Sequence, residues 1–319
     1  MLNFMSDSPI HASAKLTAWL AQGARGVAIT GASGWVGRAM SHCALQALGP
    51  DAGDRLRLFG SRAGTLPLAG QALPLESLDN PAPLGPGEWI VLHLAVSGAD
   101  RIADLQANRA RNEAMLAQAL ALAGSAQVRR FVSASSGAVY APPQAAPDKQ
   151  AYCDLKRDTE QVARAWSGKT GVPLLIPRIF NIGGPYMNHA ARYALGDMIQ
   201  QARAGGVIRI QASKPVLRSY VHVLELARVV FDLALEPQAA IVFDTAGEAV
   251  VEMADLARAV GRALDLPGLH IERPPLAAEG EDRYVGDGAI YRSALSGPAV
   301  GLDVIIRDTA AWLGAESAA

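Results

Sequence analysis

The strongest constraint on the fold is a rhythm in which short aliphatic or β-branched runs alternate with longer stretches of helical periodicity. The runs show no polar alternation and cover Val27–Thr30, Leu56–Phe59, Trp89–Ala95, Arg129–Ser135 and Val172–Phe180. Helical patterns separate them at Val36–Leu48, Ala103–Ala123 and Ala151–Ser167. Continuous apolar strands joined by helices are typical of a parallel sheet that is covered on both faces. Because such crossovers are right-handed, the sequence predicts a doubly wound α/β fold with a parallel sheet of the Rossmann type.

The rhythm changes after Phe180. A loop rich in Gly, Pro and Asn is followed by helical patterns at Tyr193–Ala204 and Val223–Leu235 and by an apolar run at Ile241–Asp244. This run is placed to rejoin the large sheet. We therefore expect a large domain of residues 1–180 with about 216–245, and a smaller C-terminal lobe of residues 181–215 with about 246–319.

The charges of the chain nearly balance. It has 319 residues, with 29 Lys and Arg against 30 Asp and Glu and a formal net charge of -1. At roughly 100–200 residues per domain, this length predicts about two lobes. The balance, without basic tracts, argues against a nucleic-acid-binding surface. Two cysteines are too few for a disulfide framework, so a reducing interior is the expected setting.

The first residues do not predict a targeting segment. Asp7, His11, Lys15 and Gln22 interrupt every apolar stretch there, whereas a secretory signal needs about 7–15 unbroken apolar residues. The run Ile90–Val96 is far shorter than the roughly 18 apolar residues that span a bilayer. We expect a cytoplasmic protein without a membrane partner, and a short amphipathic helix at residues 11–22.

Three glycines spaced three apart stand where the first strand gives way to a helix. Gly31 permits a tight turn, Gly34 lets a pyrophosphate approach the backbone, and Gly37 lets the helix pack against the strand. The helix N-terminus then supplies N–H groups and the positive end of its dipole to phosphates. In this strand–turn–helix context the spacing predicts dinucleotide binding rather than a merely structural turn. The other residues of the turn expected at the cofactor are Ser33, Trp35 and Val36.

The end of the second strand indicates which dinucleotide is bound. A site for NAD usually places a carboxylate here to hold the ribose hydroxyls. This chain instead has Gly60, Ser61 and Arg62, and a guanidinium suits a 2′-phosphate. The residues favour NADP over NAD, with Ser61 and Arg62 as cofactor contacts. Stacking of Arg62 on adenine, or simple exposure to solvent, are the alternatives.

A serine, a tyrosine and a lysine form the candidate catalytic set. Ser136 follows the fourth strand, and Tyr152 and Lys156 lie four residues apart on one face of the next helix. A free phenol has a pKa near 10, and a nearby ammonium and a cationic nicotinamide would both lower it. Tyr152 would then remove a hydroxyl proton while hydride leaves the carbon, and Ser136 would hold the same oxygen. A tyrosine and lysine at this spacing also occur by chance on surface helices.

These motifs resemble the extended short-chain dehydrogenase/reductases, in particular the NAD(P)-dependent nucleotide-sugar epimerase/dehydratase group. The shared segments are TGASGWVG, HLAV, the serine strand, YCDLK, PRIFNIGGP and RSYVHVLELA, within roughly Val27–Leu313. The resemblance implies a catalytic triad, a nucleotide-sugar substrate, and a homodimer built through the helices at Ala103–Ala123 and Ala151–Ser167. It further implies cofactor contacts at Leu94, Ala95, Asn108, Ile179 and Phe180, and substrate contacts at Ser97, Asn181, Arg218 and Arg283.

Arg218 is also favoured on chemical grounds. A sugar nucleotide carries two phosphates, so a chain of near-zero net charge has to supply local cations to hold them. Arg218 follows a proline-containing loop and precedes the apolar segment VHV. The alternative is an ordinary exposed arginine.

The chain departs from the sequence pattern of this family at two pairs of residues. Dehydratases of this group carry an Asp-Glu pair after the strand serine, because eliminating water needs a general acid and a base at adjacent carbons. Gly137 and Ala138 stand there, which argues against 4,6-dehydration. Leu224 and Glu225 replace the usual Asp pair after VHV, which we interpret as a structural substitution.

The histidines and cysteines do not indicate a metal or thiol site. The histidines lack metal-ligand spacing, and His93 on an apolar strand is expected to be a packed core residue. Cys153 is expected to pack within its helix. Neither a GxSxG elbow nor a GxxxxGK loop occurs, which removes the simplest hydrolase and nucleoside-triphosphatase interpretations.

Three functions remain open from the sequence. An epimerase would oxidise a sugar hydroxyl to a 4-keto intermediate and return hydride to the other face. An NADPH-dependent reductase would transfer hydride once to a 4-keto sugar, and Arg62 favours this version. A dinucleotide-sensing module without catalysis would use the same fold, but it would not need Ser136, Tyr152 and Lys156 together.

Overall fold

The structure, a computed structural model, describes residues 12–49, 52–97, 104–141, 147–277 and 280–317. Its contacts divide the chain into two compact units. The sheet unit comprises the described residues up to Ile179 together with Ala227–Phe243, and the C-terminal unit comprises Phe180–Leu226 together with the described residues from Asp244 onward. We expected the return to the larger domain near residue 216, whereas the chain rejoins the sheet unit at Ala227.

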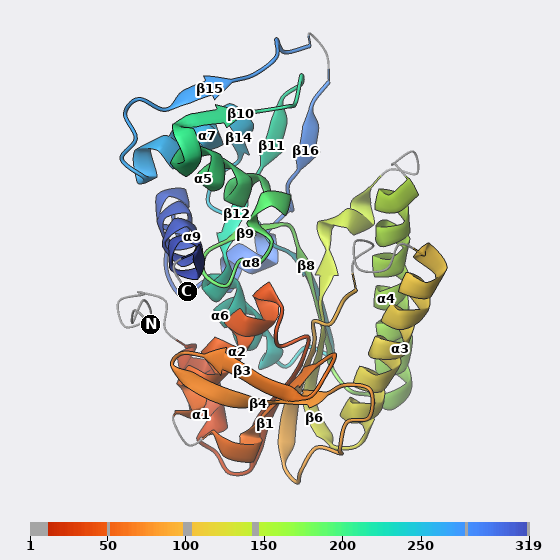
Figure 1. Cartoon of the computed structure of the whole chain (residues 1–319). Coiled ribbons are helices and arrows are strands. Elements are labelled where there is room, and N and C mark those ends of the chain that lie inside the picture. Colours follow the sequence, from red (N-terminus) through yellow and green to blue (C-terminus); the bar gives the residue numbers. More distant parts are fainter. Residues whose placement is uncertain (1–11, 50–51, 98–103, 142–146, 278–279, 318–319) are drawn as a thin grey trace. The chain divides into compact units, whose positions relative to one another are not determined.

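A parallel sheet forms the centre of the sheet unit (Figure 1). Among the described residues it has nine strands in the order β13-β8-β6-β5-β1-β2-β4-β3, and β7 pairs with β8. Both neighbours of β1 run parallel to it, and β3 and β4 form an antiparallel hairpin. The strands are β1 (Arg25–Thr30), β2 (Leu56–Gly60), β3 (Gly64–Leu68), β4 (Gln71–Ser77), β5 (Glu88–His93), β6 (Gln127–Ser133), β7 (Ser135–Ser136), β8 (Leu174–Ile179) and β13 (Ala240–Asp244). The predicted doubly wound fold is confirmed, and its direction of winding reverses between β1 and β5, where such folds bind ligands.

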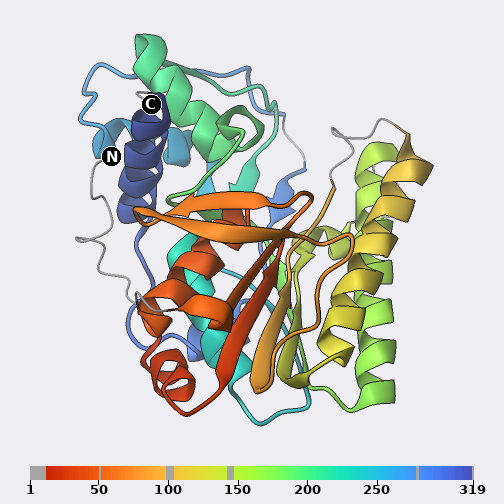
Figure 2. The ribbon, with the colours of Figure 1, turned by 60° about the horizontal axis from the view of Figure 1, so that its bottom comes forward.

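Helices cover both faces of this sheet (Figures 1 and 2). On one face lie α3 (Leu105–Gly124) and α4 (Pro147–Thr170), and on the other lie α1 (Ala14–Leu20), α2 (Trp35–Leu48) and α6 (Val223–Ala234). The expected N-terminal helix is therefore present, although His11 at its expected start lies outside the described residues. No helix within the described part of the chain combines the length and apolar character that crossing a bilayer requires.

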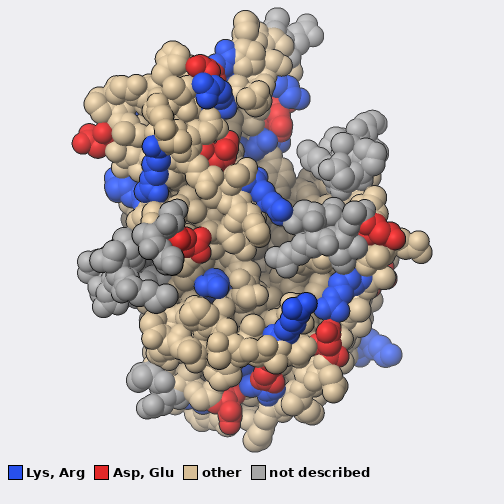
Figure 3. Space-filling model, viewed as in Figure 1, with Lys and Arg blue, Asp and Glu red and all other residues tan. Residues whose placement is uncertain are grey.

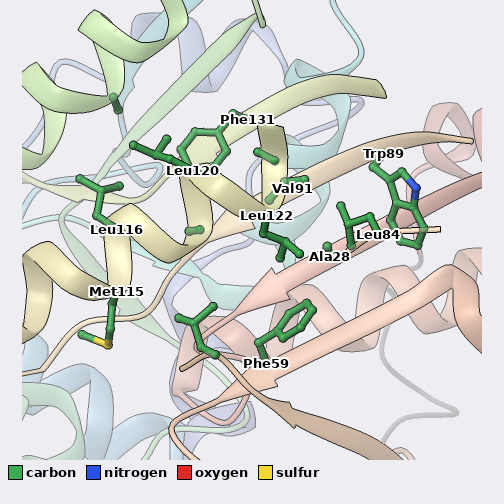
Figure 4. Close-up of a cluster of buried hydrophobic side chains, with 14 of the residues drawn as sticks. Ala28, Phe59, Leu84, Trp89, Val91, Met115, Leu116, Leu120, Leu122 and Phe131 are labelled. Atoms are coloured by element: carbon green, nitrogen blue, oxygen red, sulfur yellow. The ribbon is translucent and has the colours of Figure 1, made fainter. Parts of the chain in front are cut away.

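The core explains why the strands are apolar on both sides. Ala28, Val91 and Phe131 on three neighbouring strands belong to one buried cluster with Leu116 and Leu122 of α3 (Figure 4). The alternate residues of the same strands are also fully buried, with Val27, Ile29, Ile90 and Val132 at 0% exposure. A strand that is buried on both faces has no place for polar alternation.

One charged residue is buried in this core. Arg130 on β6 is 1% exposed and donates hydrogen bonds to the backbone carbonyls of Ala234, Glu236 and Gln238, at and just beyond the end of α6. Burial lowers its pKa to about 10. Carbonyls at a helix C-terminus carry partial negative charge, so this arginine ties α6 to the sheet without a carboxylate partner.

The C-terminal unit consists of short elements. Its helices are α5 (Ala194–Gly205), α7 (Met253–Ala263), α8 (Ala289–Ser293) and α9 (Leu302–Ser317). Its strands are β9 (Asn181–Gly183), β10 (Val207–Arg209), β11 (Val216–Arg218), β12 (Tyr220–His222), β14 (Val251–Glu252), β15 (His270–Glu272) and β16 (Asp282–Tyr284). They form three small sheets, β9 with β12, β10 with β15, and β14-β11-β16. The remaining short elements are the 3-10 turns η1 (Gly53–Arg55), η2 (Gly137–Tyr140) and η3 (Ala190–Arg192).

Candidate functional site

The first glycine of the turn is required by close packing. Gly31 follows β1 with φ of +72°, a conformation that side chains rarely adopt. A Cβ atom on Gly31 would lie 2.7 Å from the backbone nitrogen of Ala95 and 2.8 Å from the carbonyl carbon of Leu94. The turn after β1 and the segment after β5 therefore touch through their backbones, which brings Leu94 and Ala95 to the predicted cofactor turn.

The other two glycines serve different purposes. A Cβ atom on Gly37 would overlap the carbonyl oxygen of Gly31 and lie 2.8 Å from Cα of Ala32, so the first turn of α2 packs directly on the loop. Gly34 begins α2 without a side-chain cap, and a Cβ there would remain 3.3 Å from the same oxygen. Protein packing thus demands glycine strictly at positions 31 and 37. The other residues of the turn are Ser33, which is exposed, Trp35, which is buried, and Val36, which is half-buried.

Two arginines lie near the end of β2. Ser61 and Arg62 follow this strand and are exposed. Arg38, which the sequence analysis missed, extends from α2 and donates to the carbonyls of Ser33 at 3.4 Å and Pro67 at 3.5 Å. A signal was present, since Arg38 stands one helical turn after Gly34.

The segment after β5 is fixed by an amide side chain. Asn112 on α3 accepts a hydrogen bond from the backbone N–H of Ser97 at 2.9 Å and donates to the carbonyl of Ser97 at 3.0 Å. The same amide nitrogen lies 2.9 Å from Oδ1 of Asn108, which is buried. The sequence pointed to Ser97 and Asn108 but missed Asn112, which connects them.

The predicted catalytic residues come together in the sheet unit. Ser136 ends β7, and its hydroxyl is near enough to Tyr152 on α4 to lower the pKa of the phenol. The Nζ atom of Lys156 lies 5.9 Å from the centre of the Tyr152 ring and donates to the carbonyl of Ala134 at 3.0 Å. The Oγ atom of Ser136 also accepts a hydrogen bond from the N–H of Ala138 at 3.2 Å. Serine, tyrosine and lysine thus form one cluster at the carboxyl ends of the strands.

Burial dominates the proton affinities of this cluster. Burial raises the pKa of Tyr152, and the hydrogen bond from Ser136 opposes the rise, although 37% of the residue is exposed. Burial lowers the pKa of Lys156 to about 8, and the negative charge of Glu160 opposes this. We expected the ammonium to lower the pKa of the phenol. The protein by itself has the opposite net effect, because removal from water disfavours the phenolate.

A buried histidine lies behind the cluster. His93 at the end of β5 is 4% exposed, and its Nδ1 atom lies 3.0 Å from Oγ1 of Thr30. Burial, together with the charge of Lys156, lowers the pKa of His93 to about 3. Across the part of the chain that the structure describes, no group of His, Cys, Asp and Glu has the arrangement of a metal site.

The expected substrate residues belong to the C-terminal unit. The amide of Asn181 donates to the carbonyls of Ser219 and Tyr284, each at 3.3 Å. Arg218 forms a forked ion pair with Asp282, with both nitrogen–oxygen distances at 3.2 Å. It is therefore a half-buried, paired arginine and not an ordinary exposed one. Arg283 is exposed on β16.

Ile179 and Phe180 fall at the boundary between the units. Ile179 ends β8 in register with Ser136, which places it beside the candidate catalytic serine. Phe180 opens the C-terminal unit, where its N–H donates to Oγ1 of Thr245 at 2.9 Å and its ring lies 4.7 Å from that of Tyr284. The side chains of both residues are half-buried.

Charges of both signs are interspersed over the described surface in Figure 3. This distribution agrees with the formal net charge of -1. An anionic ligand would therefore have to be held by particular residues rather than by a general field.

Sequence comparison identifies the family. The profile of the NAD-dependent epimerase/dehydratase family matches residues 85–244, half of the chain. A dTDP-L-rhamnose 4-epimerase of Burkholderia thailandensis is 31% identical over 119 residues, which are 36% of this chain and 33% of that protein. The similar region therefore spans about a third of that relative.

Solved structures share the fold at low identity. A UDP-N-acetylglucosamine 4-epimerase from Methanobrevibacter ruminantium M1, in complex with UDP-N-acetylmuramic acid, has a TM-score of 0.72 at 16% identity, over 91% of this chain and 98% of that one. A dTDP-glucose 4,6-dehydratase from Streptomyces venezuelae, with NAD bound, has a TM-score of 0.71 at 19% identity, over 92% of this chain and 98% of that one. With its glycine turn, its clustered serine, tyrosine and lysine, and the profile match, this chain belongs to the NAD-dependent epimerase/dehydratase family.

Proposed function

We propose that the protein is a nucleotide-sugar epimerase that acts through a 4-keto sugar. The observation that carries this proposal is the cluster of Ser136, Tyr152 and Lys156, in which the phenol is hydrogen-bonded to the serine and lies beside the ammonium. Such a cluster suits proton transfer to and from one sugar oxygen. The similar epimerases from Burkholderia thailandensis and Methanobrevibacter ruminantium support the choice of reaction.

The backbone around the glycine turn fits a dinucleotide. Gly31 and Gly37 are glycine because neighbouring backbone atoms fill the space of a side chain, whereas at Gly34 that space is less crowded. The start of α2 has no side-chain cap, and a helix N-terminus attracts phosphates through its backbone N–H groups and the positive end of its dipole. We assign phosphate binding to Ser33, Gly34 and Trp35, and contacts with the rest of the cofactor to Leu94, Ala95, Ile179 and Phe180. A nicotinamide bound there supplies the acceptance and return of hydride.

Side chains of the protein transfer the proton that accompanies the hydride. Tyr152 as phenolate takes the proton of the sugar hydroxyl, and the resulting neutral phenol returns it to the keto oxygen in the second half of the reaction. Ser136 donates a hydrogen bond to the same oxygen in both halves. With a pKa of about 8, Lys156 is mostly an ammonium at neutral pH, and its charge favours the phenolate form of the neighbouring phenol.

A second function, reduction of a 4-keto sugar with NADPH, is favoured by the arginines near β2. Arg38 and Arg62 supply positive charge where a carboxylate would select NAD. Glu76, in register with Phe59 near the end of β2, is already ion-paired with Arg57. These contacts support NADP as the cofactor. Dehydration is disfavoured, since Gly137 and Ala138 offer neither an acid nor a base.

The substrate assignment rests on residues of the C-terminal unit. We assign the diphosphate to Asn181, Arg218 and Arg283, with Ser97 on the sugar side, and Asn108 remains assigned to the cofactor. Arg218 has to share its guanidinium with Asp282 while it binds phosphate. We also propose a homodimer that associates through α3 and α4, which the resemblance to dimeric relatives implies.

A turnover screen separates the two functions. The purified protein is incubated with UDP-glucose, UDP-N-acetylglucosamine, UDP-glucuronic acid and dTDP-L-rhamnose, and with the 4-keto forms of these sugars, while NADPH absorbance is followed. An isomer that forms without net NADPH consumption identifies an epimerase, and stoichiometric consumption identifies a reductase. Activity that survives unchanged in Tyr152→Phe would remove the assignment of the catalytic cluster.

A further inference from the structure

A buried carboxylate lies on the same helix as the catalytic tyrosine and lysine. Glu160 stands one helical turn after Lys156 and is 6% exposed. Burying a charge is costly unless it is paired and hydrogen-bonded. The proposed proton transfers do not use this residue, so its burial needs another explanation.

The carboxylate of Glu160 accepts several hydrogen bonds. Arg178 on β8 binds it through two parallel hydrogen bonds, Nε to Oε1 and Nη2 to Oε2, each at 2.8 Å. The hydroxyl of Ser135 donates to Oε1 at 2.6 Å. Arg164 adds a longer contact of 3.7 Å. Burial alone would raise the pKa of Glu160, but these partners outweigh it and leave the pKa below its usual value. The residue is therefore a carboxylate at neutral pH.

The partners of Glu160 enclose the catalytic serine. Ser135 immediately precedes Ser136, and Arg178 is in register with Ser135 across the β7–β8 pair. The third nitrogen of Arg178, Nη1, is 2.6 Å from the hydroxyl of Tyr140, the last residue of the turn that follows Ser136. The pair of Glu160 and Arg178 therefore holds the chain on both sides of Ser136.

A second arginine completes the support. Arg157, next to Lys156 on α4, donates to the carbonyls of Val139 at 2.9 Å and Ala141 at 2.8 Å. The turn after Ser136 is thus fixed to the helix that carries Tyr152 and Lys156. The serine strand, its turn, the catalytic helix and β8 form one hydrogen-bonded assembly whose centre is Glu160.

We propose that Glu160 is a positioning residue which, through Ser135 and Arg178, holds the Ser136 hydroxyl in hydrogen-bonding position against the Tyr152 phenol. The part that concerns turnover rests on the proposed function. Glu160 does not touch the reacting atoms. Its effect is on distance and angle, to which proton transfer and oxygen binding are steeply sensitive.

The test removes both charges together. Losing one partner would leave an unpaired buried charge and could simply unfold the protein, whereas Glu160→Met with Arg178→Met leaves an apolar pair of similar volume. The Tyr152 phenol is titrated by its ultraviolet absorbance in the protein without added cofactor, as the difference from the same protein carrying Tyr152→Phe. We expect its pKa to rise by about one unit, because a hydrogen bond to the phenolate is lost.

Turnover provides the second measurement. In the double variant we expect kcat to fall about 100-fold, with little change in KM or in the dissociation constant for the dinucleotide. The alkaline limb of the kcat profile should also move to lower pH, since the groups facing Lys156 are Tyr152, His93 and Glu160, and Glu160 is the one that raises its pKa. Asp158→Asn is the matched control, because this residue lies on the same helix in an exposed ion pair with Arg109, and it should leave both measurements unchanged.

A milder variant keeps the proposal testable if the double variant does not fold. Ser135→Ala breaks only the link between Glu160 and the serine strand, and it should shift both measurements in the same direction by a smaller amount. If the phenol pKa and kcat stay at wild-type values in folded Ser135→Ala and in the folded double variant, Glu160 has no positioning role. If the wild-type protein turns over no nucleotide-sugar but the phenol pKa still rises, the proposed function is wrong and the positioning role stands.

Discussion

The glycine turn and the serine–tyrosine–lysine cluster lie in the same unit but are built in opposite ways. The turn consists of backbone, and its shape follows from contacts between Gly31, Gly37 and the backbone at Ala95. The cluster consists of side chains, and the chain around Ser136 is held by hydrogen bonds that Glu160 accepts from Ser135 and Arg178 and that Arg157 donates to the following turn. Backbone geometry leaves a direct mark on the sequence in the form of glycine, whereas side-chain support leaves only scattered charged residues.

The largest expected effect is a loss of turnover without a loss of dinucleotide binding. Tyr152→Phe removes the acid–base group of the cluster and leaves the glycine turn intact, so turnover should fall about 1,000-fold. Binding of the dinucleotide, measured by calorimetry, should stay near the wild-type value. If both measurements fell together, the two regions would not be separable and the division drawn above would be wrong.

Adding one methyl group to the glycine turn should destabilise the protein. In Gly37→Ala the new Cβ would overlap the carbonyl oxygen of Gly31, so the free energy of unfolding should fall by about 3 kcal/mol and dinucleotide binding should weaken. Urea unfolding and calorimetry measure the two effects.

Gly168 in α4 is the matched control. A Cβ at this position meets nothing within 4 Å, so Gly168→Ala should stabilise the protein by about 0.5–1 kcal/mol through helix propensity alone. A loss of stability in Gly168→Ala equal to that in Gly37→Ala would mean that close packing is not what requires glycine in the turn.

The same contrast explains what the sequence could and could not predict. The strand–turn–helix segment was predicted to within two residues: the strand expected from Val27 begins at Arg25, and the helix expected from Val36 begins at Trp35. The β3–β4 hairpin was missed because Pro67 and Pro74 argue against strands. Since β3 is the edge strand, a missing backbone donor there is tolerated.

Within the candidate site, the missed residues are those that act across elements. Ser136, Tyr152 and Lys156 were predicted because they sit in short motifs. Asn112 and Arg178 reach their partners from α3 and β8, and local spacing carries no information about such pairs. Glu160 offered one signal, a carboxylate four residues after Lys156 on the same helix face.

The exposed arginine after β2, Arg62, should determine whether the protein prefers NADP or NAD. Arg62→Ala should weaken NADP binding by roughly 10-fold to 100-fold, the scale of one charge-assisted hydrogen bond, and leave NAD binding nearly unchanged. Calorimetric titration with both dinucleotides measures the difference. Equal loss for both would favour stacking on adenine, and no loss would mean that Arg62 only faces solvent. Arg38→Ala tests whether the second arginine shares the 2′-phosphate.

His93 connects the two regions. Its ring contacts Thr30, the residue before the glycine turn, and its carbonyl accepts a hydrogen bond from Ala134, whose own carbonyl binds Lys156. Burial lowers the pKa of His93 to about 3, so between pH 6.5 and 3 the unfolded chain binds a proton that the folded protein does not. The free energy of unfolding should therefore fall on acidification by about 1.4 kcal/mol per pH unit from this residue.

Urea unfolding at pH 7 and pH 5 tests this connection. His93→Gln should reduce the dependence on pH by the share of one histidine. His42 on α2 is the matched control, since burial lowers its pKa to about 4 without help from Lys156, and His42→Gln should reduce the dependence similarly over this range. The two variants should differ only below about pH 4, where His93 alone still resists protonation. A pH dependence in His93→Gln as steep as that of the wild-type protein would mean that His93 takes up a proton in the folded protein as it does in the unfolded chain. An imidazolium there would repel Lys156 and weaken the cluster that Glu160 and Arg178 support.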